Sequence, residues 1–208
     1  FRLAEALENA AFAGARDSAA SLYKKLVDTD SEGRWGSLAG LRLGAIHLAQ
    51  ERQFLAYRTI SLWGERHPYA VEDIRYRMSL AEASFLTNRF SRAVSLMNAM
   101  LPGELDTRSR RRFDAYRIRA LVAMGEYGRA TARLANFRAN YHEPESGRIA
   151  SVLACELYYV AGSPELADSY REMLKDTDGY EELVELFALQ ARLRRGGDKK
   201  TLDRLRKD

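Results

Sequence analysis

Cysteine, proline and long apolar runs are scarce in this sequence. Among 208 residues there is one cysteine, Cys155, which excludes an internal disulfide and which we expect to be a buried spacer between helices. The four prolines fall where helices should begin or end, and no strand-like alternation of apolar and polar residues occurs. No window approaches about 18 uninterrupted apolar residues, so we expect no transmembrane segment in this chain. With abundant Ala, Leu, Arg and Glu, these features predict an all-α protein.

Side chains that carry catalysis or bind metals are few and scattered. The three histidines, His47, His67 and His142, lie far apart and lack metal-ligand spacing. Neighbouring acids at positions 143 and 145 fall at a predicted helix start, where carboxylates interact favourably with the helix dipole. No glycine-rich phosphate loop follows a strand-like segment. We therefore expect no enzyme activity, no metal site and no cofactor.

An internal repeat with a step of 37 residues runs through the chain. Five alanines stand in register with this step, at Ala19, Ala56, Ala93, Ala130 and Ala167. Apolar residues follow most of them four and seven positions later, which places each alanine and its followers on one helix face. A fixed period between about 20 and 50 residues indicates a solenoid or a repeat array.

The same step selects a candidate corner before each alanine. The corner residues are Gly14, Glu51, Asn88, Gly125 and Gly162. Glycine and asparagine tolerate the left-handed backbone conformation that ends many helices, so each corner should close a helical hairpin. Glu51 lacks this tolerance, and we expect a looser or longer turn there.

The prediction is five helical hairpins over residues 1–178, followed by a capping helix and a basic C-terminal segment over residues 179–208. The expected helices span residues 3–12, 17–27, 35–50, 53–66, 71–86, 91–100, 111–124, 127–140, 148–161, 164–175 and 181–194. The chain opens at Phe1 without a methionine, so we expect it to be a fragment or a processed product.

Two units carry residues typical of a known helical repeat. They are Gly44, Ala56 and Pro68 in one unit, and Ala120, Gly125, Tyr127 and Ala130 in another. With them the chain resembles the tetratricopeptide repeat, although its step is longer than the usual period of about 34 residues. The repeat length and the residues around Pro68 are similar to those of bacterial envelope proteins, namely the outer-membrane assembly lipoproteins and the Tol-Pal-associated coordinators. The resemblance implies a right-handed superhelical solenoid of antiparallel helical hairpins, serving as a protein-interaction scaffold in the bacterial envelope or periplasm.

In tetratricopeptide arrays the first helix of each hairpin lines a concave groove. The resemblance places ten residues there: Arg75, Met78, Glu82 and Phe85, then Arg112, Arg119 and Val122, then Val152, Glu156 and Tyr159. Arginine beside exposed aromatics is a composition found in binding hot spots, so we expect another protein as the partner, through an acidic or mixed peptide or helix. The alternative is that Phe85 and Tyr159 belong to the core and that the arginines only solvate the surface.

Two other functions stay open on the sequence alone. Six arginines between Arg108 and Arg119, together with the basic C-terminal end, keep nucleic acid as a candidate partner. Repeats that read RNA base by base need the same polar residues at equivalent places in each unit, and here these places differ. The other alternative is a helical accessory domain of a larger enzyme, such as a soluble lytic transglycosylase.

Overall fold

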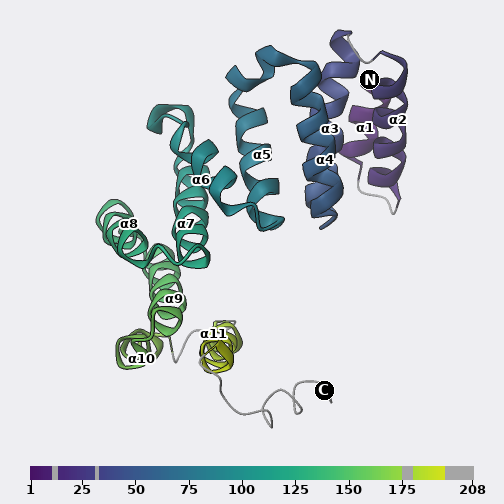
Figure 1. The fold of residues 1–208 in the computed structure, drawn as a ribbon. Helices are drawn as coiled ribbons and strands as arrows, with labels where there is room; N and C mark the ends of the chain where they lie inside the picture. Colours follow the sequence, from purple (N-terminus) through teal and green to yellow (C-terminus); the bar gives the residue numbers. More distant parts are fainter. Residues whose placement is uncertain (11–13, 31–32, 175–179, 195–208) are drawn as a thin grey trace. The chain divides into compact units, whose positions relative to one another are not determined.

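The structure, a computed structural model, describes residues 1–10, 14–30, 33–174 and 180–194 (Figure 1). All regular secondary structure in these ranges is helical and none of it is strand, which confirms the predicted all-α class. The chain divides into two compact units, Phe1–Glu104 and Leu105–Asp208, and each is described by itself. The basic C-terminal segment expected from the sequence lies outside the described residues from position 195 onward.

The described part of the first unit holds six α-helices. They are α1 (Arg2–Glu8), α2 (Ala15–Thr29), α3 (Arg34–Ala49), α4 (Gln53–Arg66), α5 (Ile74–Leu86) and α6 (Phe90–Asn98). Two short 3-10 helices, η1 (Pro68–Glu72) and η2 (Pro102–Glu104), follow α4 and α6. Each α-helix packs against the next, and α3 also contacts α5, so the first helices of two neighbouring hairpins lie together.

The second unit holds five α-helices among its described residues. They are α7 (Thr107–Ala123), α8 (Tyr127–Asn140), α9 (Pro144–Ala161), α10 (Pro164–Glu172) and α11 (Glu181–Arg194). Helix α7 packs against α8 and α9, and α9 also packs against α8, α10 and α11. Each described α-helix in the two units corresponds to one of the predicted ranges.

The largest differences from the predicted ranges are the early starts of α7 and α9 and the end of α1 at Glu8, four residues before its predicted end. The Asp106 carboxylate accepts a hydrogen bond from the Ser109 amide at 2.9 Å, and this cap begins α7 at Thr107. Helix α9 begins at Pro144, where a proline suits the first turn because its missing N–H would have no partner inside the helix. Both starts carry a local capping signal that the apolar periodicity does not contain.

The five alanines of the 37-residue step are core residues. Ala19, Ala56, Ala93, Ala130 and Ala167 all have an exposed fraction of 0%. Most of the apolar residues four and seven positions later are buried as well, for example Ile60, Met97 and Phe137. The face that the sequence selects on each second helix is therefore the face that packs.

The five predicted corners share one backbone conformation. Their φ angles are 79° at Gly14, 58° at Glu51, 60° at Asn88, 77° at Gly125 and 94° at Gly162. These are the residues with left-handed φ in the described part of the chain. The repeat is thus present in the backbone as well as in the sequence.

The expectation of a looser turn at Glu51 is wrong. The Glu51 amide donates to the Leu48 carbonyl at 3.1 Å, and the Arg52 amide donates to the His47 carbonyl at 2.9 Å. An equivalent pair of bonds, at 3.0 and 2.9 Å, closes the corner at Gly125. The left-handed conformation costs a residue with a Cβ atom about 1–2 kcal/mol, so the packing of α3 on α4 sets this turn against the local preference.

The lone cysteine is a buried core residue, as expected. The Cys155 side chain is fully buried, and its Sγ lies 3.5 Å from the carbonyl oxygen of Ala167, where α9 meets α10. Burial raises the pKa of the thiol to about 11, so the unreactive protonated form predominates at neutral pH.

Leucine at Ala130 should destabilise the protein, because a fully buried helix contact has no space for three further carbon atoms. We expect Ala130→Leu to lower the free energy of unfolding by about 1–3 kcal/mol. The matched control is Ala132→Leu, two residues further along α8, where the side chain is exposed. Denaturant unfolding followed by circular dichroism compares the two. Equal stability of both variants and the parent would show that the alanine register does not mark helix contacts.

Glycine at Glu51 should stabilise the protein, because it removes the strain of a left-handed residue with a Cβ atom. We expect Glu51→Gly to raise the free energy of unfolding by about 0.5–1 kcal/mol. This is a net value, because the greater conformational freedom of glycine in the unfolded chain offsets part of the relieved strain. Asn88→Gly is the control at an equivalent corner, and its gain should be smaller because asparagine tolerates this conformation. A destabilised Glu51→Gly variant would mean that the Glu51 side chain, and not its backbone, holds the turn.

Candidate functional site

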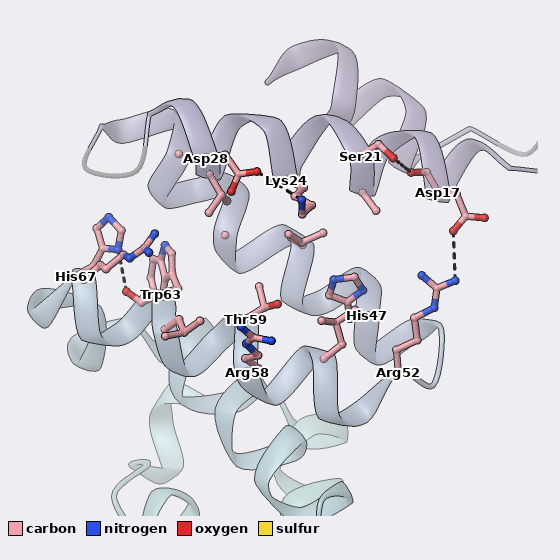
Figure 2. A pocket seen from close by; sticks show the side chains of 18 residues that line it. Asp17, Ser21, Lys24, Asp28, His47, Arg52, Arg58, Thr59, Trp63 and His67 are labelled. Atoms are coloured by element: carbon pink, nitrogen blue, oxygen red, sulfur yellow. Dashed lines mark hydrogen bonds and ion pairs between the residues drawn. The ribbon is translucent and has the colours of Figure 1, made fainter.

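A cleft of about 470 Å³ lies in the first unit, between α2 and α4 (Figure 2). Its volume falls in the range of about 300–1,000 Å³ that is typical of binding sites. Helix α3, which contacts both neighbours, forms its base. Figure 2 shows Asp17, Ser21, Lys24 and Asp28 of α2 along one wall, and side chains of α4 along the other.

The base of the cleft is α3, which packs closely on its neighbours through glycines. A Cβ atom at Gly40 would lie 2.4 Å from Cδ1 of Trp63, and one at Gly44 would lie 2.3 Å from Cγ1 of Ile60. Either contact would push α4 away from α3, so the close packing of the two helices requires glycine. Gly36, Gly40, Leu43 and His47 line the base between the two walls.

The wall from α4 is amphipathic. Leu55 and Leu62 are 42% and 41% exposed, and they stand seven residues apart on the side that faces the cleft. Trp63 lies beside them and is only 8% exposed. Exposed leucines two helical turns apart form an apolar strip that a partner would cover.

Positive charge exceeds negative charge around the cleft. The lining contains four cationic residues, Lys24, Arg52, Arg58 and Arg66, against the two carboxylates at positions 17 and 28. Arg52 lies 3.8 Å from Asp17, and Lys24 lies 3.6 Å from the carboxylate at position 28. Arg58 and Arg66 are exposed and form no ion pair with any described residue. They leave a local excess of two positive charges, which suits an anionic partner.

Several buried polar atoms at the cleft have no hydrogen-bond partner among the described residues. They are Nδ1 of His47, Nε1 of Trp63 and Nε2 of His67. His47 is 7% exposed, and burial followed by the charge of Arg52 holds its pKa below the usual value, so the ring is neutral at pH 7. These three atoms are buried in the packing beneath the cleft surface, so they offer no exposed donor or acceptor to a partner.

His67 is oriented by its own helix. Its Nδ1 donates to the carbonyl oxygen of Trp63 at 2.9 Å, so Nδ1 carries a proton. The ring stacks on Trp63 with centroids 5.2 Å apart. The two rings together close one end of the cleft, and the pair of Asp17 and Arg52 closes the other (Figure 2).

The predicted groove residues of α5 lie in the first unit, away from the residues that line the cleft. Arg75 is exposed, and it pairs with Asp73, the cap of its own helix, at 2.7 Å. Met78 and Glu82 are half-buried. Phe85 is buried and packs edge-on against Phe90, with ring centroids 5.8 Å apart, so this aromatic ring belongs to the core.

The predicted groove residues of α7 and α9 lie in the second unit. The structure brings two of them together, because Nε of Arg119 lies 2.8 Å from a carboxylate oxygen of Glu156. Arg112 is exposed and lines a shallow hollow with Arg108 and Tyr116.

The remaining three predicted residues of the second unit, Val122, Val152 and Tyr159, are buried. The Tyr159 hydroxyl donates to Asp168 at 2.5 Å, and burial followed by this bond raises its pKa to about 12. Phe85, Val122 and Tyr159 are separated by the 37-residue step, and all three are core positions. The alternative that Phe85 and Tyr159 belong to the core is the one that the structure supports.

Three of the six arginines of α7 pair with carboxylates of their own unit. Arg111 lies 3.1 Å from Glu145 of α9, and Arg119 pairs with α9 as described above. Arg117 pairs with Asp114 at 2.7 Å within α7. These contacts give the cluster a structural role between two packed helices, and they reduce the charge that it presents to nucleic acid.

The cleft itself is absent from the sequence-based candidates. Its signal in the sequence is a second apolar and basic strip on α4, at Leu55, Arg58, Leu62 and Arg66, adjacent to the strip that begins at Ala56. Spacings of three, four and seven residues identify both strips as helix faces, but they do not tell which face a neighbouring helix covers.

No group of three metal-binding side chains gathers in the described ranges. No described helix is both long and apolar enough to cross a membrane. Comparison of the chain with protein-family models, curated proteins and solved structures gives no match.

Proposed function

We propose that this protein is a non-catalytic scaffold that binds a segment of another protein, and that the segment lies in the cleft between α2 and α4. One observation carries the proposal. Exposed Leu55 and Leu62 stand beside Arg58 and Arg66, which pair with no described carboxylate, on a single wall opposite a second helix. Apolar area next to arginine is the composition of protein-binding surfaces.

The architecture supports a tetratricopeptide-like repeat in each unit. Corners spaced by 37 residues share the left-handed conformation, and the alanine after each corner is buried. First helices of neighbouring hairpins touch, as α3 and α5 do in the first unit and α7 and α9 do in the second. The repeat length and the residues around Pro68 are similar to those of bacterial envelope proteins. We therefore extend the proposal to a repeat scaffold of an envelope or periplasmic assembly in bacteria.

The predicted groove residues remain second candidate surfaces within this proposal, one in each unit. The accessible ones are Arg75, Met78 and Glu82 in the first unit and Arg112, Arg119 and Glu156 in the second. Arg75 and Arg119 already pair with Asp73 and Glu156, so they have less charge to offer a partner than Arg58 and Arg66 have. The cleft is therefore the first surface to test.

Site-specific photo-crosslinking in the native host tests the proposal. A photoreactive phenylalanine replaces Leu62 in the cleft, Met78 on α5, or Leu101, which is 66% exposed outside both surfaces. We expect a discrete crosslinked partner from position 62 and none from position 101. Crosslinking from position 78 alone would move the site to the groove, and no discrete crosslink from either position would contradict the scaffold.

A double variant with reversed charge tests whether Arg58 and Arg66 bind the crosslinked partner. Arg58→Glu with Arg66→Glu should abolish the crosslink from position 62, because the partner would lose both arginines. The matched control is Arg16→Glu with Arg148→Glu, which changes the net charge equally at exposed positions outside the cleft. The control should crosslink as the parent does, and circular dichroism should show equal helicity for both variants.

A further inference from the structure

We infer that the occupant of the cleft is a single amphipathic α-helix, whose apolar seam covers Leu55 and Leu62 and whose carboxylates pair with Arg58 and Arg66. This inference rests on the proposed function and adds the conformation, the charge and the register of the bound segment. It depends on the spacing of residues on the two walls, on their charges and on the exposed leucines of α4.

Both walls of the cleft are helices, and this favours a helical occupant. The backbone N–H and C=O groups of α2 and α4 are satisfied inside those helices, so they cannot pair with an extended peptide as a sheet edge does. A helix satisfies its own backbone and can enter an apolar cleft without that cost. Helix-in-groove binding is therefore the mode that these walls allow.

The spacing on each wall matches what a packed helix requires. On α4, the lining residues at positions 55, 58, 59, 62 and 66 recur at steps of three and four. On α2, positions 17, 20, 21, 24, 27 and 28 do the same. Such steps form straight rows of side chains along a helix, and a third helix can fit its own row between two of them.

The dimensions fit a short helix. The α4 wall runs from Arg52 to Arg66, which corresponds to about 20 Å along the helix axis at 1.5 Å per residue. A helix of about 14 residues has this length. Arg58 and Arg66 are separated by about 12 Å along the axis, so the two carboxylates of the occupant should stand seven or eight residues apart.

The charges determine which side of the occupant faces which wall. The carboxylates of α2 are already paired with Lys24 and Arg52, whereas Arg58 and Arg66 of α4 have no described carboxylate partner. The acidic side of the occupant therefore faces α4. Its other side faces Ala20 and Val27 of α2, where small or neutral residues fit.

The two kinds of exposed side chain on α4 define the occupant. Leu55 and Leu62 need apolar cover, and Arg58 and Arg66 need carboxylates. The expected segment is thus leucine-rich on one face and acidic along one edge.

Designed peptides test this inference on the full chain. Peptide one is an 18-residue helix with a leucine seam and glutamates seven residues apart beside it. Peptide two has the same composition with the leucines scattered around the helix. Peptide three replaces the glutamates of peptide one with lysine. Fluorescence anisotropy measures the affinity of each peptide for the parent protein and for the variant Arg58→Glu with Arg66→Glu.

We expect the parent to bind peptide one about tenfold more tightly than peptide three, because two exposed ion pairs together contribute up to about this factor. Peptide two should bind more weakly still. The charge-reversed protein should show the opposite preference and bind peptide three better than peptide one. The control variant with Arg16→Glu and Arg148→Glu should behave as the parent does.

Three results would overturn the inference. They are failure of peptide one to bind, equal binding of peptides one and two, and the absence of a reversed preference in the charge-reversed protein. Binding of dodecanoate with displacement of peptide one would assign the cleft to a small amphipathic anion. A crosslink from position 62 without peptide binding would reject the acidic helix and keep the scaffold, whereas the absence of a crosslink from both position 62 and position 78 would reject the scaffold itself.

Discussion

The close contact between α3 and α4 determines the shape of the first unit and of its cleft. Gly40 and Gly44 bring the backbone of α3 against Trp63 and Ile60, at distances where any side chain would collide. Ala56 adds a small residue on the opposite helix and is completely buried. Because α4 uses this face for packing, the adjacent face with its leucines and arginines is left at the surface. The base of the cleft and its amphipathic wall are thus two consequences of one helix contact.

The same contact explains why a glutamate stands in a left-handed corner. Glu51 joins α3 to α4 with the hydrogen bonds that glycine makes at the equivalent corner of the second unit. The strain at one residue is about 1–2 kcal/mol, which is small beside the burial of Ile60, Trp63 and Tyr76 that the hairpin makes possible. Tertiary packing therefore overrides local preference here, and the 37-residue step proved a better guide to the turn than the residue type.

The helices were largely predictable from the sequence, and the cleft was not. A period that recurs five times is a stronger signal than any single residue, so helices, corners and buried alanines were predicted with few errors. The caps at Asp106 and Pro144 account for the early starts of α7 and α9. The groove residues were chosen by analogy, and Phe85, Val122 and Tyr159 proved to be core because apolar residues repeated at one step are a packing signal. Which face of α4 is exposed depends on where α2 and α3 lie. The apolar and basic residues of α4 do not by themselves show which of its faces a neighbouring helix covers.

We propose that a partner helix binds between α2 and α4 of the first unit. Methyl NMR of the full chain tests this binding site, with leucine and methionine methyl groups assigned and peptide one added in steps. We expect the methyl signals of Leu55, Leu62 and Leu43 to shift together and saturate, while those of Leu101 and Leu166 stay in place. Shifts centred on Met78, with the cleft leucines unchanged, would contradict it.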